Sequence, residues 1–243
     1  MDNVKLLMSL SKYLAHAGVG SRRAVVDLIE QKKVQVNGVI VTNPAHRIEP
    51  EDRVVYDGKT ITHEHKVYIM FNKPVDCITT ARDEHDRTTV LDYLSKQCNA
   101  RVYPIGRLDR DTTGLLLLTN DGQLTHRLAH PRYEIKKTYH VTLERIFMTA
   151  HERTLKKGIM LEDGLVVPDN VVIIEGSHRR VVSVTVHSGK YHVIRRLFEA
   201  LGHTITNLDR AVYAGLTKQG LRPGSWRPLT HHEVERLKRL CAT

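Results

Sequence analysis

The chain has 243 residues, 41% of them hydrophobic, and a formal net charge of +10 at pH 7. That length allows one large domain or a medium and a small one, and no apolar run approaches the roughly 18 residues that a membrane span needs. The start lacks the pattern of a signal peptide, and Cys77, Cys98 and Cys241 show no metal-binding spacing. We therefore expect a cytoplasmic protein with reduced thiols. We also expect a monomer that needs no metal and no cofactor.

The first predicted elements are two helices. Leu10, Tyr13, Leu14 and Ala17 recur at helical spacing. Gly18 then ends the first helix. Ser21 is suited to cap a second helix, which carries apolar residues on one face.

A hairpin and a further strand follow. Asn37-Gly38 separates two short β-rich runs and is a strong signal for a tight hairpin turn. Residues 53–56 predict another strand, and residues 60–66 predict a linker. We place a small α+β domain at residues 5–60 and a second domain at residues 66–240.

The second domain is predicted to be α+β, because its strands outnumber its helices without strict alternation. It has three predicted helices. One follows Gly122, another includes Ile194 to Leu201, and the last begins after Thr230, which forms a capping box with Glu233. The predicted strands are 67–71, 115–118, 138–143 and 181–186.

The positive charge is uneven along the chain. Residues 1–65 hold nine Lys/Arg against eight Asp/Glu, whereas residues 66–243 hold 28 against 19. Such a balance favours an anionic partner but is also common in soluble basic proteins. Clustering of the cations is therefore more informative than their sum.

Cations gather at one helix start in the small domain. Arg22 and Arg23 lie in the first turn after Ser21, where the helix macrodipole disfavours cations unless that end faces phosphate. Residues 9–57 resemble the αL RNA-binding domain named after a small-subunit ribosomal protein. The resemblance implies RNA contacts by a set of polar residues: Ser21, Arg22, Arg23, Lys32, Lys33 and Asn37.

Asp109 and Asp111 stand in the run Gly-Arg-Leu-Asp-Arg-Asp-Thr-Thr-Gly at residues 106–114. Taken alone, such carboxylates most often cap a turn. They also suit a hard cation. The Asp-x-Asp-x-Thr order is shared with haloacid-dehalogenase phosphatases, but no apolar strand precedes it and no downstream Asp pair follows it.

Four motifs in order favour another interpretation. They are Asn-Lys-Pro at 72–74, residues 106–122, Lys-Thr-Tyr-His-Val at 137–141, and Gly-Lys-Tyr-His-Val-Ile-Arg-Arg-Leu-Phe at 189–198. Together with the preceding αL domain they resemble the bacterial ribosomal-RNA pseudouridine synthases of the RsuA and RluB type. The resemblance covers about residues 9–240. One departure is Val193, where many relatives have Gln.

The resemblance implies a role for each matching residue. Asp109 is the catalytic aspartate, Tyr139 stacks on the target base, and Arg195 is the cation paired with Asp109. Arg107, Leu108 and Ile194 belong to the substrate pocket, with Arg107 assisting extrusion of the uridine. Their charge beside the motifs suggests four further RNA contacts: Lys73, Arg110, Arg196 and Arg210.

The implied fold has a mostly antiparallel mixed sheet flanked by helices. The implied reaction isomerises uridine in ribosomal RNA, as a stem-loop or assembly intermediate, with a slight preference for 23S over 16S RNA. The base must leave its stack to be reached. Asp109 would then attack the sugar or remove a ribose proton. The alternative is a non-catalytic RNA-binding or ribosome-assembly factor, which has no need of a carboxylate facing phosphate.

Overall fold

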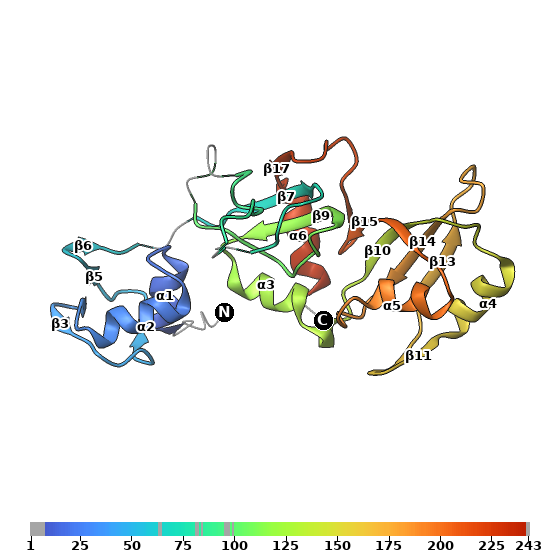
Figure 1. Cartoon of the computed structure of the whole chain (residues 1–243). Coiled ribbons are helices and arrows are strands. Elements are labelled where there is room, and N and C mark those ends of the chain that lie inside the picture. The colour runs from blue at the N-terminus through green and yellow to red at the C-terminus, as the bar shows by residue number, and fades with distance from the viewer. Residues whose placement is uncertain are drawn as a thin grey trace. The chain divides into compact units, whose positions relative to one another are not determined.

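The computed structural model describes residues 8–62, 65–80, 83, 85–94, 98 and 100–241. The chain divides into two compact units, residues 1–66 and 67–243 (Figure 1). Each unit combines helices with mainly antiparallel strands, so the predicted α+β class is confirmed. No helix among the described residues is long and apolar enough to cross a membrane.

The small unit packs two helices on short strands. A cluster that includes Leu14 of the first helix, Ile29 of the second and Val34 forms its core. The strands pair as β3-β2-β5-β6 and β1-β4. Its elements are β1 (Met8–Ser9), α1 (Leu10–His16), α2 (Arg22–Glu30), β2 (Val34–Val36), β3 (Val39–Ile40), β4 (Arg47–Ile48), β5 (Val54–Tyr56) and β6 (Lys59–Thr60).

The local signals of this unit act as predicted. The backbone N–H of Ala24 donates to the Ser21 hydroxyl, which caps α2. Asn37 and Gly38 have φ values of 52° and 83°, as a type I′ hairpin turn requires. The linker expected at residues 60–66 overlaps the end of β6, which pairs with β5 as far as Thr60.

The large unit is built on one mixed sheet. Seven strands follow the order β13-β14-β10-β15-β9-β7-β17, with β16 beside β15 and β8 beside β9. Only the β15–β9 pairing is parallel among the described strand pairs of this sheet. The sheet strands are β7 (Tyr68–Lys73), β8 (Tyr103–Pro104), β9 (Thr112–Thr119), β10 (Lys137–Leu143), β13 (Asn170–Ile173), β14 (Val181–Val186), β15 (Ile205–Tyr213), β16 (Leu216–Thr217) and β17 (Trp226–Pro228).

Helices and connecting segments cover this sheet on both faces. The remaining elements are α3 (Gly122–Ala129), a 3₁₀ turn (Pro131–Tyr133), α4 (Thr149–Lys157), α5 (Val193–Ala200), α6 (His231–Leu240) and the separate hairpin β11 (Ile159–Leu161) and β12 (Gly164–Val166). The predicted capping box of Thr230 and Glu233 starts α6. Helix α4 was not predicted, because Leu155 is its only buried residue and gives no apolar periodicity.

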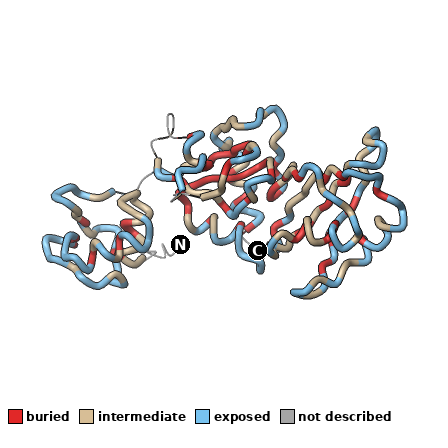
Figure 2. Tube along the Cα trace, viewed as in Figure 1, coloured by how far each residue is buried: buried red, intermediate tan, exposed pale blue. Residues whose placement is uncertain are grey.

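The uninterrupted leucine run of β9 reflects burial on both faces of the strand. Leu115 and Leu117 pack in the cluster that contains Leu237 of α6, whereas Leu116 and Leu118 pack on the opposite side. Successive strand residues point to opposite faces, so a strand covered on both sides needs no polar alternation. Figure 2 shows this stretch as a buried central part of the large unit.

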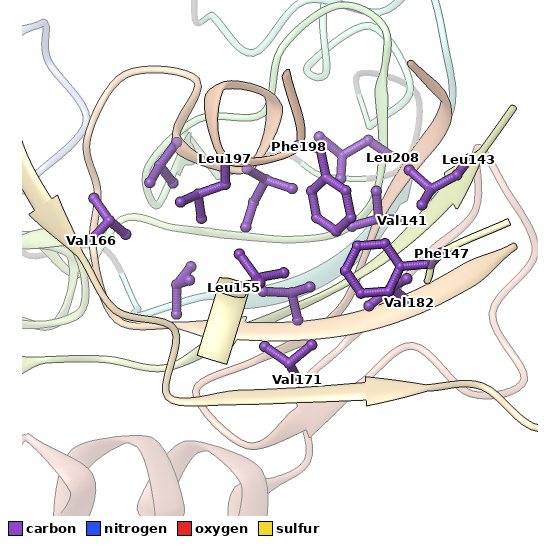
Figure 3. Packing of buried hydrophobic residues seen from close by; sticks show 14 residues of the cluster. Val141, Leu143, Phe147, Leu155, Val166, Val171, Val182, Leu197, Phe198 and Leu208 are labelled. Atoms are coloured by element: carbon purple, nitrogen blue, oxygen red, sulfur yellow. The ribbon is translucent and has the colours of Figure 1, made fainter. Parts of the chain in front are cut away.

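A third cluster fixes the orientation of α5. Leu197 and Phe198 of α5 are fully buried and pack with Val141 of β10 and Val182 of β14 (Figure 3). Phe147 lies next to Phe198, with 5.6 Å between ring centroids. This packing holds the first turn of α5 at one place beside the sheet.

The parallel pairing of β9 and β15 requires a glycine. Gly114 has a φ of 111°, and a Cβ atom built on it would lie 2.6 Å from the backbone nitrogen of Arg210. A larger residue would push apart the two strands that carry the adjacent polar turn.

Candidate active site

A buried lysine supports the backbone of the turn before β9. Lys73 is fully buried, and its ammonium donates to the carbonyl oxygens of Pro74, Arg110 and Thr112 at 3.0, 3.2 and 2.9 Å. Burial lowers the pKa of Lys73, while Asp109 and Asp111 are among the nearby charges that raise it. The backbone that presents Asp109 is therefore held on a rigid support.

A cavity of about 290 Å³ lies beside this turn. Its volume is close to the lower bound, roughly 300 Å³, of small-molecule sites. The walls come from the turn, β10, β15 and the start of α5. The lining residues are Gly106, Arg107, Leu108, Asp109, Thr112, Ala129, Lys137, Tyr139, Ser188, Gly189, Lys190, Tyr191, His192, Val193, Ile194, Arg195, Leu208, Arg210 and Tyr213.

The structure brings all six residues expected for catalysis and the substrate pocket to this cavity. Leu108 and Ile194 are 6% and 3% exposed and form apolar wall, and Arg107 is exposed at the rim. Tyr139 is half-buried on β10, opposite Arg210 of β15. Polar and apolar groups thus converge around the Asp109 carboxylate, whose side chain is 41% exposed.

The ionic partners differ from those expected. The Arg195 guanidinium lies 2.8 Å from the Asp111 carboxylate, whereas Asp109 faces His192, with 3.4 Å between Oδ1 and Nε2. Within the described residues, the predicted ion pair between Asp109 and Arg195 is not formed. The first turn of α5 presents Arg195 to the more exposed of the two carboxylates and leaves the imidazole beside the other.

Two further cations, Lys137 and Arg210, line the cavity. Lys137 donates to the carbonyl oxygens of His187 and Ser188 at 3.1 and 3.4 Å. Burial lowers the pKa of Lys137 to about 8, and the Arg210 charge adds to that effect. Arg210 donates from Nε to the Leu115 carbonyl at 2.8 Å. These cations make the pocket suitable for an electron-rich ligand.

Two of the suggested RNA contacts, Lys73 and Arg210, are buried, and Arg210 lines the cavity. Lys73 is 0% exposed and Arg210 is 2% exposed, and each bonds backbone carbonyls instead of facing solvent. The sequence shows that a charged residue lies next to a motif, but not to which face of its strand the side chain points. Asn37 is exposed, and its amide donates to Asp52 while its oxygen accepts from the Arg53 backbone.

Two other suggested contacts stay near the surface in ion pairs. Arg110 is bonded to Asp76 at 3.0 Å, and Arg196 to Asp163 at 2.9 Å. Lys190 joins the same Asp163 at 3.5 Å. Asp163 therefore ties the hairpin of β11 and β12 to the basic segment around α5.

The small unit presents its own cations at the surface. Arg22, Arg23, Lys32 and Lys33 are exposed, as is Ser21. None of the four forms an ion pair within the described residues 8–62. Arg22 and Arg23 in the first turn of α2, and Lys32 and Lys33 after its C-terminal end, are available to an external anion.

Sequence reasoning gave no role to His192, Lys137 or Tyr191. All three were quoted within motifs, but nothing in the spacing identified His192 as the neighbour of Asp109. The motif that supplied Tyr139 also contains Lys137, which lies two residues before Tyr139 on β10. No group of three or more potential metal-binding side chains was found among the described residues.

The comparisons with known proteins agree with these two units. The S4 domain model matches residues 8–54, and the RNA pseudouridylate synthase model matches residues 67–200. The chain is 42% identical to ribosomal large subunit pseudouridine synthase B of Bacillus subtilis (strain 168), over 95% of this chain and 96% of that protein. It is 37% identical to ribosomal small subunit pseudouridine synthase A of Escherichia coli (strain K12), over 93% and 98%. A crystal structure of a pseudouridylate synthase aligns with a TM-score of 0.68 at 32% identity, covering 95% of this chain and 99% of that one.

Proposed function

This chain belongs to the RNA pseudouridylate synthase family, and we propose that it converts a specific uridine of ribosomal RNA to pseudouridine with Asp109 as the catalytic carboxylate. The observation that carries the proposal is the placement of Asp109. Its carboxylate lines a cavity that is also lined by Tyr139, Ile194 and several cations.

The reaction suits such a cavity. Breaking the bond between the base nitrogen and the ribose, turning the base and joining it through carbon adds and removes no atoms. The detached base must stay enclosed while it turns, which the apolar walls of Leu108 and Ile194 favour. Asp109 is the carboxylate available to act on the everted nucleoside.

Tyr139 and Arg195 complete the proposed active site. An everted base loses its neighbours in the stack, and an aromatic ring replaces that contact at roughly 1–3 kcal/mol per base. Tyr139 presents such a ring in the pocket wall. Arg195 contributes its charge from the first turn of α5, held there by Asp111.

The small unit is proposed to dock on folded RNA. The exposed cations Arg22, Arg23, Lys32 and Lys33 contact phosphate. The exposed Ser21 lies beside Arg22 and Arg23 at the start of α2. Arg107, Arg110 and Arg196 extend this contact to the RNA around the pocket. We assign large-subunit RNA as the substrate, supported by the greater identity to the large-subunit enzyme, and the cytoplasm as the place of reaction.

The test is a map of pseudouridines in ribosomal RNA from a strain that lacks this gene. We expect one site to be lost, in 23S RNA, and to be restored by the wild-type gene but not by D109N. An unchanged map would contradict the proposed activity. Loss of a 16S site would contradict only the assignment to the large subunit, and restoration by D109N would contradict the role of Asp109.

A further inference from the structure

An exposed aromatic ring stands at the mouth of the pocket. Tyr191 is 70% exposed although it lines the cavity, and it is among the most exposed large apolar side chains described. Its hydroxyl makes no hydrogen bond in the described part of the chain. A large ring left in water beside a ligand site is typical of a recognition surface.

The ring is held in place from one side. The Tyr191 and His192 rings stack with 3.8 Å between centroids and 17° between planes. Since His192 covers one face of the phenol ring, the exposed area belongs to its other face and its edges. His192 has a left-handed φ of 47° and lies 3.4 Å from the Asp109 carboxylate. The pair is a two-ring platform anchored at the candidate catalytic group.

Everting a nucleoside leaves two bases with one unstacked face each. Both belong to the nucleotides next to the target, and their phosphates follow the same strand past the pocket mouth. The surroundings of Tyr191 suit that strand, because Arg107 is exposed and lines the same cavity. Lys190 and Arg195 also line it, each paired with a carboxylate, Asp163 and Asp111 respectively. An aromatic face beside cations is the usual arrangement for holding single-stranded nucleic acid.

We propose that Tyr191, stacked on His192, binds the base of a nucleotide adjacent to the everted uridine. This inference rests on the proposed function and adds a base-binding subsite outside the pocket that holds the target. The stack keeps the flanking base from closing the gap that the uridine leaves. Tyr191 is thus a positioning residue, because it touches a neighbour of the reacting nucleoside.

Fluorescence of 2-aminopurine tests the contact directly, since stacking quenches it. Two RNA hairpins carrying the mapped target uridine are made, one with 2-aminopurine on its 5′ side and one with it on its 3′ side. We expect wild-type protein to quench one of the two, Y191F to keep that quenching, and Y191L to abolish it. Y191L is also expected to raise the Kd for the hairpin about tenfold, the loss of one base stack.

Pseudouridine formation on the unlabelled hairpin separates this inference from the function on which it rests. Wild-type protein that modifies no ribosomal uridine would overturn both. Active protein that quenches neither probe would overturn the subsite alone. Quenching that survives in Y191L, measured with protein whose thermal unfolding matches the wild type, would also overturn it, because the ring would then not be its source.

Discussion

Replacing Lys73 by Met tests how the turn that carries Asp109 is held. The ammonium of Lys73 makes three hydrogen bonds to backbone carbonyls in a site that is 0% exposed. Hydrogen bonds from a charged group contribute roughly 1.5–3 kcal/mol each, or about 6 kcal/mol for three. Burial opposes the charge, as the lowered pKa of Lys73 indicates, and its cost of several kcal/mol offsets part of that sum.

We therefore expect K73M to lower the free energy of unfolding of the large unit by about 3 kcal/mol. Trp226, the chain's single tryptophan, reports this transition, because it pairs with Phe71 on the strand that ends at Lys73. Urea unfolding followed by its fluorescence measures the change. K157M, at an exposed lysine of α4, is the matched control and should change stability by less than about 0.5 kcal/mol.

The same variant should lose activity beyond its loss of folded protein. Freed from Lys73, the carbonyls of Arg110 and Thr112 can move, and a displacement of about 1 Å at Asp109 costs on the order of 100-fold in rate. Single-turnover pseudouridine formation, at a temperature where K73M is folded, measures this. If K73M has the same free energy of unfolding as K157M and a rate within twofold of it, Lys73 does not support the turn.

Three other outcomes follow from the structure. Charge reversal in R22E/R23E should weaken RNA binding at least tenfold and reduce its salt dependence, whereas equal affinity in a filter-binding titration would remove the small unit from docking. Y139F should retain more activity than Y139A if stacking is the main contribution, and the reverse order would indicate the hydroxyl. Arg227 lowers the pKa of Glu233 to about 2, so its carboxylate stabilises the fold above pH 4.5 and progressively less as the pH falls toward 2. Because Arg227 is 38% exposed, E233Q should lose only about 1 kcal/mol at pH 7, and that difference in urea unfolding should vanish near pH 2.

Local signals were the most predictable part of the fold. Ser21, the Asn37-Gly38 turn and the Thr230 capping box each depend on residues within four positions of one another, and the structure confirms them. The family and the presence of an αL-type domain were predicted correctly as well, since four spaced motifs in one order are specific.

Side-chain partners across the fold were not predictable. Arg195 and Asp111 are brought together by the packing of α5 on β10 and β14, whereas the family resemblance implied Asp109 as the partner. Lys73 and Arg210 looked like surface cations because their charge was visible in the sequence, whereas their burial depends on strands paired later in the chain. Long-range contacts of this kind decide the direction of each side chain, and no local pattern encodes them.

The most direct test compares D109N with D111N in single-turnover pseudouridine formation on the mapped ribosomal RNA fragment. Both changes remove one negative charge from the same turn, and the two carboxylates differ in their partners, His192 and Arg195. We expect no detectable product with D109N at RNA binding within threefold of the wild type, and residual activity with D111N. Turnover by D109N would contradict the catalytic role of Asp109.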